Sequence, residues 1–90
     1  MKYYIPRTIT LPFGYKIKVK QLRKKKWKVA YREAFNDNAH DETAAFCTPE
    51  ETGATIVLQH NRTPKERKED LIHELQHAMV EYGEYVKSIE

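Results

Sequence analysis

Polar and apolar side chains alternate most regularly at residues 15–22, which have the sequence YKIKVKQL. Tyr15, Ile17 and Val19 fall on one side of an extended chain and lysines fall on the other, which predicts a half-buried β-strand. The fourteen residues before this strand mix β-branched and aromatic side chains with two prolines. Such a composition predicts an extended segment or an edge strand rather than a helix.

Between Leu22 and Phe35 the apolar residues recur every three or four positions, which predicts one helix with a single apolar face. That face consists of Trp27, Ala30, Tyr31, Ala34 and Phe35. The sequence NDN at 36–38 then ends the helix. The run RKKKWK at 23–28 has the composition of a phosphate-binding patch, but we expect Trp27 in the core because it shares the apolar face.

Residues 43–59 predict a β-hairpin with strands at roughly 43–48 and 54–59. The sequence PEETG at 49–53 forms the turn, in which Gly53 can take a positive φ. A second helix is predicted to start near Pro64, because Thr63 and Glu66 have the spacing of a reciprocal capping box.

This last helix should reach at least Tyr82, and Gly83 then ends, bends or weakens it. At about 100° per residue, seven side chains gather on one core face. They are Leu71, Leu75, Ala78, Met79, Tyr82, Val86 and Ile89. The elements therefore predict an α+β fold with the order strand, helix, β-hairpin, helix in one domain over residues 1–90.

The length limits the core, because a chain of 90 residues buries only about 60 to 65% of the surface of its unfolded form. A bound metal would help such a chain to fold. No apolar run approaches the ~18 residues that cross a bilayer, and MKYYIPRTIT lacks the features of a signal peptide. We therefore expect a soluble, cytoplasmic protein without a membrane partner. Cys47 is the only cysteine, so an internal disulfide is excluded, and we expect a small buried side chain.

The net charge of +3 hides an uneven distribution of charge along the chain. Residues 1–32 carry eleven Lys/Arg and no Asp/Glu, whereas residues 33–90 carry five Lys/Arg and thirteen Asp/Glu. The alternating lysines Lys16, Lys18 and Lys20 indicate a solvated face or the protection of a sheet edge. A nucleic-acid-binding stripe that includes residues 23–28 is the minor alternative.

The sequence IHELQH at 72–77 places His73 and His77 four positions apart on the last helix, away from its core face. Residues at this spacing have Cβ atoms about 5 to 6 Å apart, so both imidazoles can reach one zinc ion at about 2.0 to 2.1 Å. Glu74 is rotated by about 100° from His73. It is therefore placed to accept a proton from a metal-bound water, as in the zinc hydrolase helix motif.

Residues 53–82, GATIVLQHNRTPKERKEDLIHELQHAMVEY, resemble the zincin-like metallopeptidases. The similarity is greatest to the small ones of phages and mobile elements and to the ImmA/IrrE-type peptidases. It implies a zincin-like domain with Zn²⁺ held by His73 and His77, Glu74 as the catalytic residue, and a peptide or protein substrate. It also implies that ATIVLQ is the edge strand on which an extended substrate lies. A phage-encoded member would act in the cytoplasm of the host.

Catalytic zinc usually has a third protein ligand, which many relatives supply from a later helix. Glu81 matches the acidic position of the family after its HELxHA sequence, as a ligand or as support for a histidine. Glu84 is in line with the histidines but reaches the ion only if the chain turns back at Gly83. The remaining candidates are His40, Cys47, His60, Asp70 and a group from a partner subunit.

The expected function is therefore a zinc-dependent metallopeptidase in which zinc activates a water and Glu74 is the general base. The oxyanion needs a further donor, for which Tyr82, Tyr85 and His60 are candidates. One alternative is a zincin-derived domain that binds zinc or a partner without hydrolysis. The other is a basic nucleic-acid-binding module. The sequence leaves the substrate and the oligomeric state open.

Overall fold

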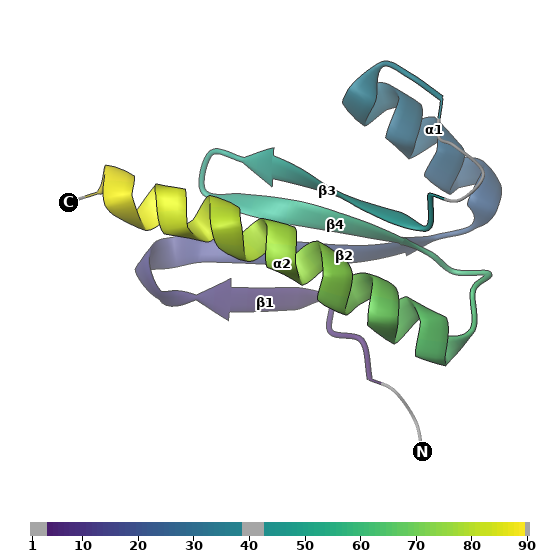
Figure 1. The fold of residues 1–90 in the computed structure, drawn as a ribbon, viewed down its shortest axis with the longest axis horizontal. Coiled ribbons are helices and arrows are strands. Elements are labelled where there is room, and N and C mark those ends of the chain that lie inside the picture. Colours follow the sequence, from purple (N-terminus) through teal and green to yellow (C-terminus); the bar gives the residue numbers. More distant parts are fainter. Residues whose placement is uncertain (1–3, 39–42, 90) are drawn as a thin grey trace.

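A computed structural model describes residues 4–38 and 43–89, which form a four-stranded sheet and two α-helices (Figure 1). Along the chain the elements are β1 (Thr8–Leu11), the 3-10 turn η1 (Pro12–Gly14), β2 (Tyr15–Leu22), α1 (Lys24–Phe35), β3 (Ala45–Glu50), β4 (Gly53–Gln59) and α2 (Pro64–Ser88). The α+β class and the predicted order of elements are confirmed. The predicted edge strand in the first fourteen residues is β1.

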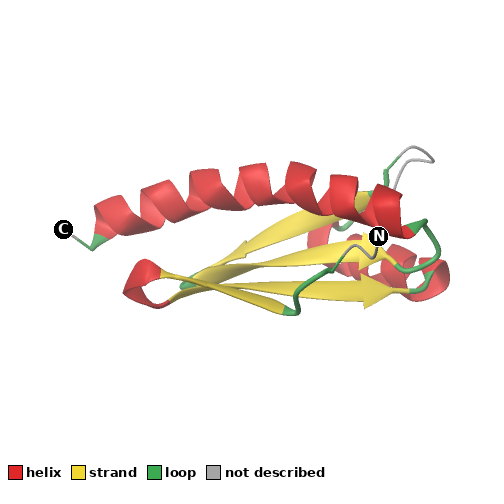
Figure 2. Ribbon diagram, turned by 90° about the horizontal axis from the view of Figure 1, so that it is seen from below, coloured by secondary structure: helices red, strands yellow, loops and turns green. Residues whose placement is uncertain are grey.

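The sheet is mixed, with the strand order β1-β2-β4-β3. β1 pairs antiparallel with β2 and β3 pairs antiparallel with β4, while the two central strands β2 and β4 are parallel. α2 covers one face of the sheet and α1 packs on the other (Figure 2). Tyr15, Ile17 and Val19 are buried beneath α2, whereas the lysines between them are exposed on the opposite face. The alternation in β2 was therefore predicted correctly.

The position of β4 corrects one expectation. The sequence ATIVLQ was expected at the edge of the sheet, but β4 lies between β2 and β3, and all seven of its residues are buried. A strand covered by neighbours on both sides cannot accept a further strand. β3 is the edge strand on this side, and its Pro49 is compatible with an edge because proline cannot donate to a ladder.

The β3–β4 hairpin is tighter than predicted, because Glu50 pairs with Gly53 and only Glu51 and Thr52 form the turn. Gly53 does not take the positive φ that the sequence suggested. It lies directly beside the backbone of β2, where an added Cβ would overlap the carbonyl oxygen of Lys16. Glycine is required here by the close approach of the two central strands.

Two hydrophobic clusters lie on opposite faces of the sheet. The larger one, beneath α2, contains buried residues of β2, β4 and α2, namely Tyr15, Ile17, Val19, Ala54, Ile56, Leu58, Leu71 and Ala78. The smaller one joins α1 to the sheet through Trp27, Phe46 and Val57. The Trp27 indole Nε1–H donates a hydrogen bond to the Val57 carbonyl oxygen at 3.2 Å, so Trp27 is a core residue as predicted.

α2 begins at Pro64 with the predicted capping box. The Thr63 hydroxyl accepts from the Glu66 backbone N–H, and the Glu66 carboxylate accepts from the Thr63 N–H. The helix passes through Gly83 and ends at Ser88, so Gly83 does not stop it. In the part of the chain that the structure describes, no helix is both long and apolar enough to cross a membrane.

The face that α2 turns to the sheet differs from the predicted core face. Met79 and Ile89 were expected in the core but are 46% and 49% exposed. Glu74 is instead buried, and Tyr85 packs against the core. The helix is therefore rotated about its axis toward Glu74, and this rotation determines how the histidines and Glu74 are presented.

Candidate metal centre

α2 places the two histidines and the glutamate of IHELQH in two different environments. His73 and His77 are exposed, whereas Glu74 is 7% exposed and lies between α2 and the sheet. Its neighbours on the buried side of the helix are Leu71 and Ala78, which belong to the larger hydrophobic cluster. The predicted polar positions of the two imidazoles are confirmed, and the carboxylate between them is more buried than the sequence suggested.

The side chains of His73, Glu74 and His77 converge. One donor atom from each residue lies within 4.8 Å of the other two, which is close enough for a shared metal ion. The imidazole centroids are 5.1 Å apart with ring planes at 81°, and His73 Nε2 lies 3.9 Å from a Glu74 carboxylate oxygen. Two nitrogens and one carboxylate are a donor set that zinc accepts.

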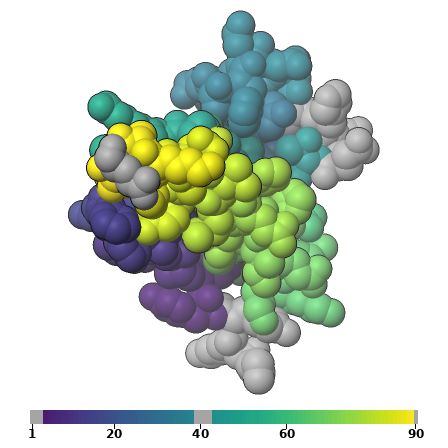
Figure 3. All heavy atoms as spheres, turned by 60° about the vertical axis from the view of Figure 1, so that its left-hand side comes forward, coloured from purple at the N-terminus to yellow at the C-terminus, as the bar shows by residue number. Residues whose placement is uncertain are grey.

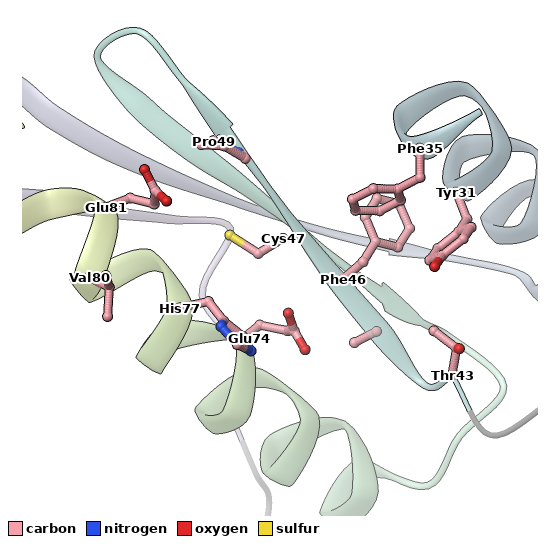
Figure 4. Close-up of a pocket in the computed structure, with 11 residues that line it drawn as sticks. Tyr31, Phe35, Thr43, Phe46, Cys47, Pro49, Glu74, His77, Val80 and Glu81 are labelled. Atoms are coloured by element: carbon pink, nitrogen blue, oxygen red, sulfur yellow. The ribbon is translucent and has the colours of Figure 1, made fainter. Parts of the chain in front are cut away.

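This cluster opens into a groove of about 460 Å³ between α2 and the edge strand β3. Glu74 and His77 point toward β3, which carries Cys47, while Tyr31 and Phe35 of α1 lie beyond that strand (Figure 4). A second hollow of about 280 Å³ continues on the other side of Glu74, where Asp70, His73 and Thr43 line it. The buried carboxylate therefore borders both hollows along the edge of the sheet.

Burial raises the pKa of Glu74, and the neighbouring Asp70 acts in the same direction. The imidazoles of His73 and His77 oppose this shift when they are positively charged. Asp70 itself accepts hydrogen bonds from the Arg62 guanidinium, the shorter at 2.6 Å. This ion pair joins the loop before α2 to its second turn. A carboxylate with a raised pKa is suited to accept a proton and to release it again.

The candidates for a third ligand are placed unequally. Glu81 lines the same groove as Glu74 and His77 but is not a member of the converging cluster. Cys47 also lines the groove, from β3. Asp70 lines the second hollow and is paired with Arg62. His40 lies outside the described residues.

Two other candidates are remote from the cluster. Glu84 could approach it only if the chain turned back at Gly83, but α2 continues to Ser88, and Glu84 lies about 10 Å along the axis beyond His77. Its carboxylate is 3.7 Å from Lys87 instead. His60 is an exposed residue after β4 and lines neither hollow.

The two tyrosines considered as oxyanion donors serve to pack the fold. Tyr82 and Tyr85 both contact the ring of Tyr15, with centroids 5.2 and 5.1 Å away. Their hydroxyls donate to the carbonyl oxygens of Pro12 and Phe13, at 3.4 and 2.6 Å. They therefore connect the second half of α2 to the β1–β2 connection by hydrogen bonds, and neither tyrosine lines the groove.

Two further groups on this side of the sheet have raised pKa values. Burial raises the pKa of the Cys47 thiol to about 11, and the carboxylates of Glu74 and Glu81 add to this shift. The buried Tyr15 hydroxyl has no hydrogen-bond partner among the described residues, and its pKa is raised by burial and by the nearby Cys47 and Glu81. The alternation in β2 identified Tyr15 as a core residue, but no sequence signal indicated that its hydroxyl lacks a hydrogen-bond partner there.

No protein-family model matches the chain, and comparisons with the curated proteins and with the solved structures found no match.

Proposed function

We propose that this domain is a zincin-like zinc-dependent peptidase. The observation that carries the proposal is the convergence of His73, Glu74 and His77 within 4.8 Å, beside a groove at an open sheet edge. A helix that presents two imidazoles four residues apart, with a glutamate directly after the first, has the arrangement of the zinc hydrolase helix. The general α+β architecture is compatible with this function but does not specify it.

The residues present fit a zinc ion, with His73 and His77 as its holders. Both imidazoles are exposed, and His73 Nε2 lies 3.9 Å from a Glu74 carboxylate oxygen. A bound zinc ion lowers the pKa of a water and polarises a carbonyl group. Glu74 accepts the proton of the attacking water and passes it to the leaving amine. Glu81, one turn beyond His77, lines the same groove and is the candidate for the third ligand there.

β3 provides the place for the peptide. Among the described residues β3 pairs only with β4, so its outer edge presents backbone groups that no described strand pairs. An extended peptide adds to such an edge through main-chain hydrogen bonds. Since side chains of the added strand alternate, one set would face Glu74 and His77 and the other would face Tyr31 and Phe35 of α1. Phe35 is 45% exposed, so an apolar side chain would bury it.

The test compares cleavage and zinc content in matched variants. With a fluorescently labelled unfolded protein as substrate, Glu74→Gln should cleave at least about 100-fold more slowly, as expected for loss of a general base. It should still retain close to one equivalent of zinc by elemental analysis. His77→Ala should lose both zinc and cleavage, and Lys65→Gln, at an exposed position of α2, should change neither. Cleavage by Glu74→Gln at the wild-type rate would overturn the proposal.

A second candidate function is binding without catalysis: a zincin-derived domain would bind zinc or an extended peptide and not cleave it. It is favoured by one observation: within residues 4–38 and 43–89, the converging cluster offers two imidazoles and Glu74, so no third ligand remains in it when Glu74 acts as the base. Zinc binding by the wild type, without cleavage of any unfolded substrate, would support this function. Loss of zinc from Glu81→Ala would show that the groove supplies the third ligand and would favour the peptidase.

A further inference from the structure

The lysines of β2 do not protect a sheet edge, because β2 lies inside the sheet between β1 and β4. Lys16, Lys18 and Lys20 are exposed on the face opposite α2. We call this surface the lysine face. One of the two ordinary explanations for such a row, the protection of an exposed edge against aggregation, therefore fails.

The lysines of the lysine face are not held in ion pairs. None of the three lysines makes an ion pair within 4.0 Å in the described parts of the chain. Their cross-strand neighbours are neutral, namely Thr8, Thr10, Gly53, Thr55 and Val57. Alternate residues of a strand are about 6.6 Å apart, which is less than the Debye length of about 8 Å at physiological salt. The ammonium groups therefore repel one another, and the row does not serve stability.

Further cations follow at the end of β2. Arg23, Lys24, Lys25, Lys26 and Lys28 are all exposed in and before the first turns of α1. That first turn contains no acidic residue. Cations at this end of a helix oppose its dipole. The acidic groups on this side are Glu33 and Glu50, which share a hollow of about 470 Å³ with Lys20, and Glu50 also borders Lys16 and Lys18.

We propose that the lysine face binds the phosphate backbone of double-stranded DNA without sequence preference. Ammonium groups contact phosphates and carry no base readout. A duplex presents about one negative charge per 1.7 Å of its axis, so it matches a row of exposed lysines better than an isolated anion does. This binding is independent of the zinc cluster, which lies on the other side of the sheet.

The side chains of the lysine face favour a duplex over single-stranded nucleic acid and over an anionic membrane. Single-strand binding proteins stack bases on exposed aromatic rings. In the hollows beside the three lysines the one aromatic ring among the described residues is that of Phe46, which is only 5% exposed and cannot stack bases, while the exposed ring of Phe35 lines the groove at β3. A membrane-binding surface inserts apolar side chains between its lysines. Here Thr8, Thr10 and Thr55 flank the row instead.

The test measures the salt dependence of binding to a fluorescent duplex of 20 base pairs by anisotropy. Replacing Lys16, Lys18 and Lys20 together with glutamine should weaken binding at least about tenfold in 50 mM salt. It should also make the slope of log K against log salt shallower by about 2.7, which corresponds to three phosphate contacts. The matched control replaces Lys65, Lys68 and Lys87, three exposed lysines of α2, by glutamine. It removes the same net charge and should leave most of the affinity and slope unchanged.

Several outcomes would overturn the assignment. Equal losses in the two triple variants would show that only net charge matters. An unchanged slope in the β2 variant, with circular dichroism confirming that it is folded, would exclude the lysine face. Tighter binding to the single strand of equal length, or to vesicles with anionic headgroups, would assign the face to another partner. Replacement of the three lysines by arginine keeps the charge and should retain binding. Glu74→Gln should bind the duplex as the wild type does, so a failed peptidase test leaves this one intact.

Discussion

The two faces of the sheet use charge in opposite ways. On the α2 face, two carboxylates are buried or paired. Glu74 lies under the helix, and Asp70 accepts a hydrogen bond from the Arg62 guanidinium at 2.6 Å. On the lysine face, Lys16 and Lys18 project from an interior strand into solvent without an ion pair among the described residues. A substitution on the first face therefore changes stability and pKa values. Replacing a lysine on the second changes the surface potential with little effect on the fold.

The hydrophobic support of the two faces is also unequal. α2 (green to yellow) extends across the visible surface in Figure 3, between α1 (blue) and the β1–β2 end (purple), and covers the larger core cluster. α1 is held by the small cluster of Trp27, Phe46 and Val57. The helix that carries the candidate metal centre therefore packs on the larger core. The helix α1, on the side of the lysine face, is held by the smaller cluster alone.

The largest expected effect is the loss of stability when the smaller cluster is disrupted. Trp27→Ala removes a side chain that is 1% exposed together with its hydrogen bond to Val57. Such a change should lower the free energy of unfolding by about 3 to 5 kcal/mol, measured by urea denaturation. Val29→Ala, at a position 52% exposed on the same helix, is the control and should cost less than about 0.5 kcal/mol. Equal costs would show that α1 is not packed against the sheet as described.

A smaller effect tests the sheet that divides the two faces. Gly53→Ala would place a Cβ against the Lys16 carbonyl oxygen, so the central strands β2 and β4 would have to separate. We expect a loss of about 1 to 3 kcal/mol in the same denaturation measurement. Gly83→Ala is the matched control, because nothing lies within 4 Å of an added Cβ there. In a helix interior this change should add about 0.5 to 1 kcal/mol. Stabilisation by both substitutions would refute the close strand approach.

Local signals predicted much of this molecule from the sequence. The alternation in β2 and the capping box at Thr63 depend on residues within one element, and both are confirmed. The parallel pairing of β2 with β4 depends on residues far apart in the chain. Gly53 was therefore assigned to a turn, although its real constraint is the backbone of Lys16. The continuous apolar run in β4 is typical of a strand buried on both faces. The prediction of an edge strand followed from the family resemblance instead, and it was wrong.

The candidate site was predicted in its residues but not in its surroundings. A helical wheel counts Glu74 as polar and Met79 as apolar, so it rotates α2 away from its observed position. The actual rotation is set by Tyr82 and Tyr85, which pack on Tyr15 and donate hydrogen bonds to the β1–β2 connection. Such long-range contacts have no local sequence signal. The same reason explains why the groove beside β3 could not be predicted.

The smallest expected effect concerns the buried acid of the α2 face. Because burial raises the pKa of Glu74, the folded chain holds this proton more tightly than the unfolded chain does. Ionisation therefore costs stability as pH rises above about 4.3, the value for an unperturbed glutamate, and the cost is complete above the raised folded-state pKa. Glu74→Gln cannot ionise, so in the presence of a chelator its stability relative to wild type should increase between pH 4 and pH 7, by less than about 1 kcal/mol. Urea denaturation at both pH values measures this, with Glu69→Gln, an exposed position of α2, as the control. A relative stability that decreases with pH would mean that the carboxylate is stabilised in its ionised form, and the contrast between a buried acid and an exposed lysine row would be lost.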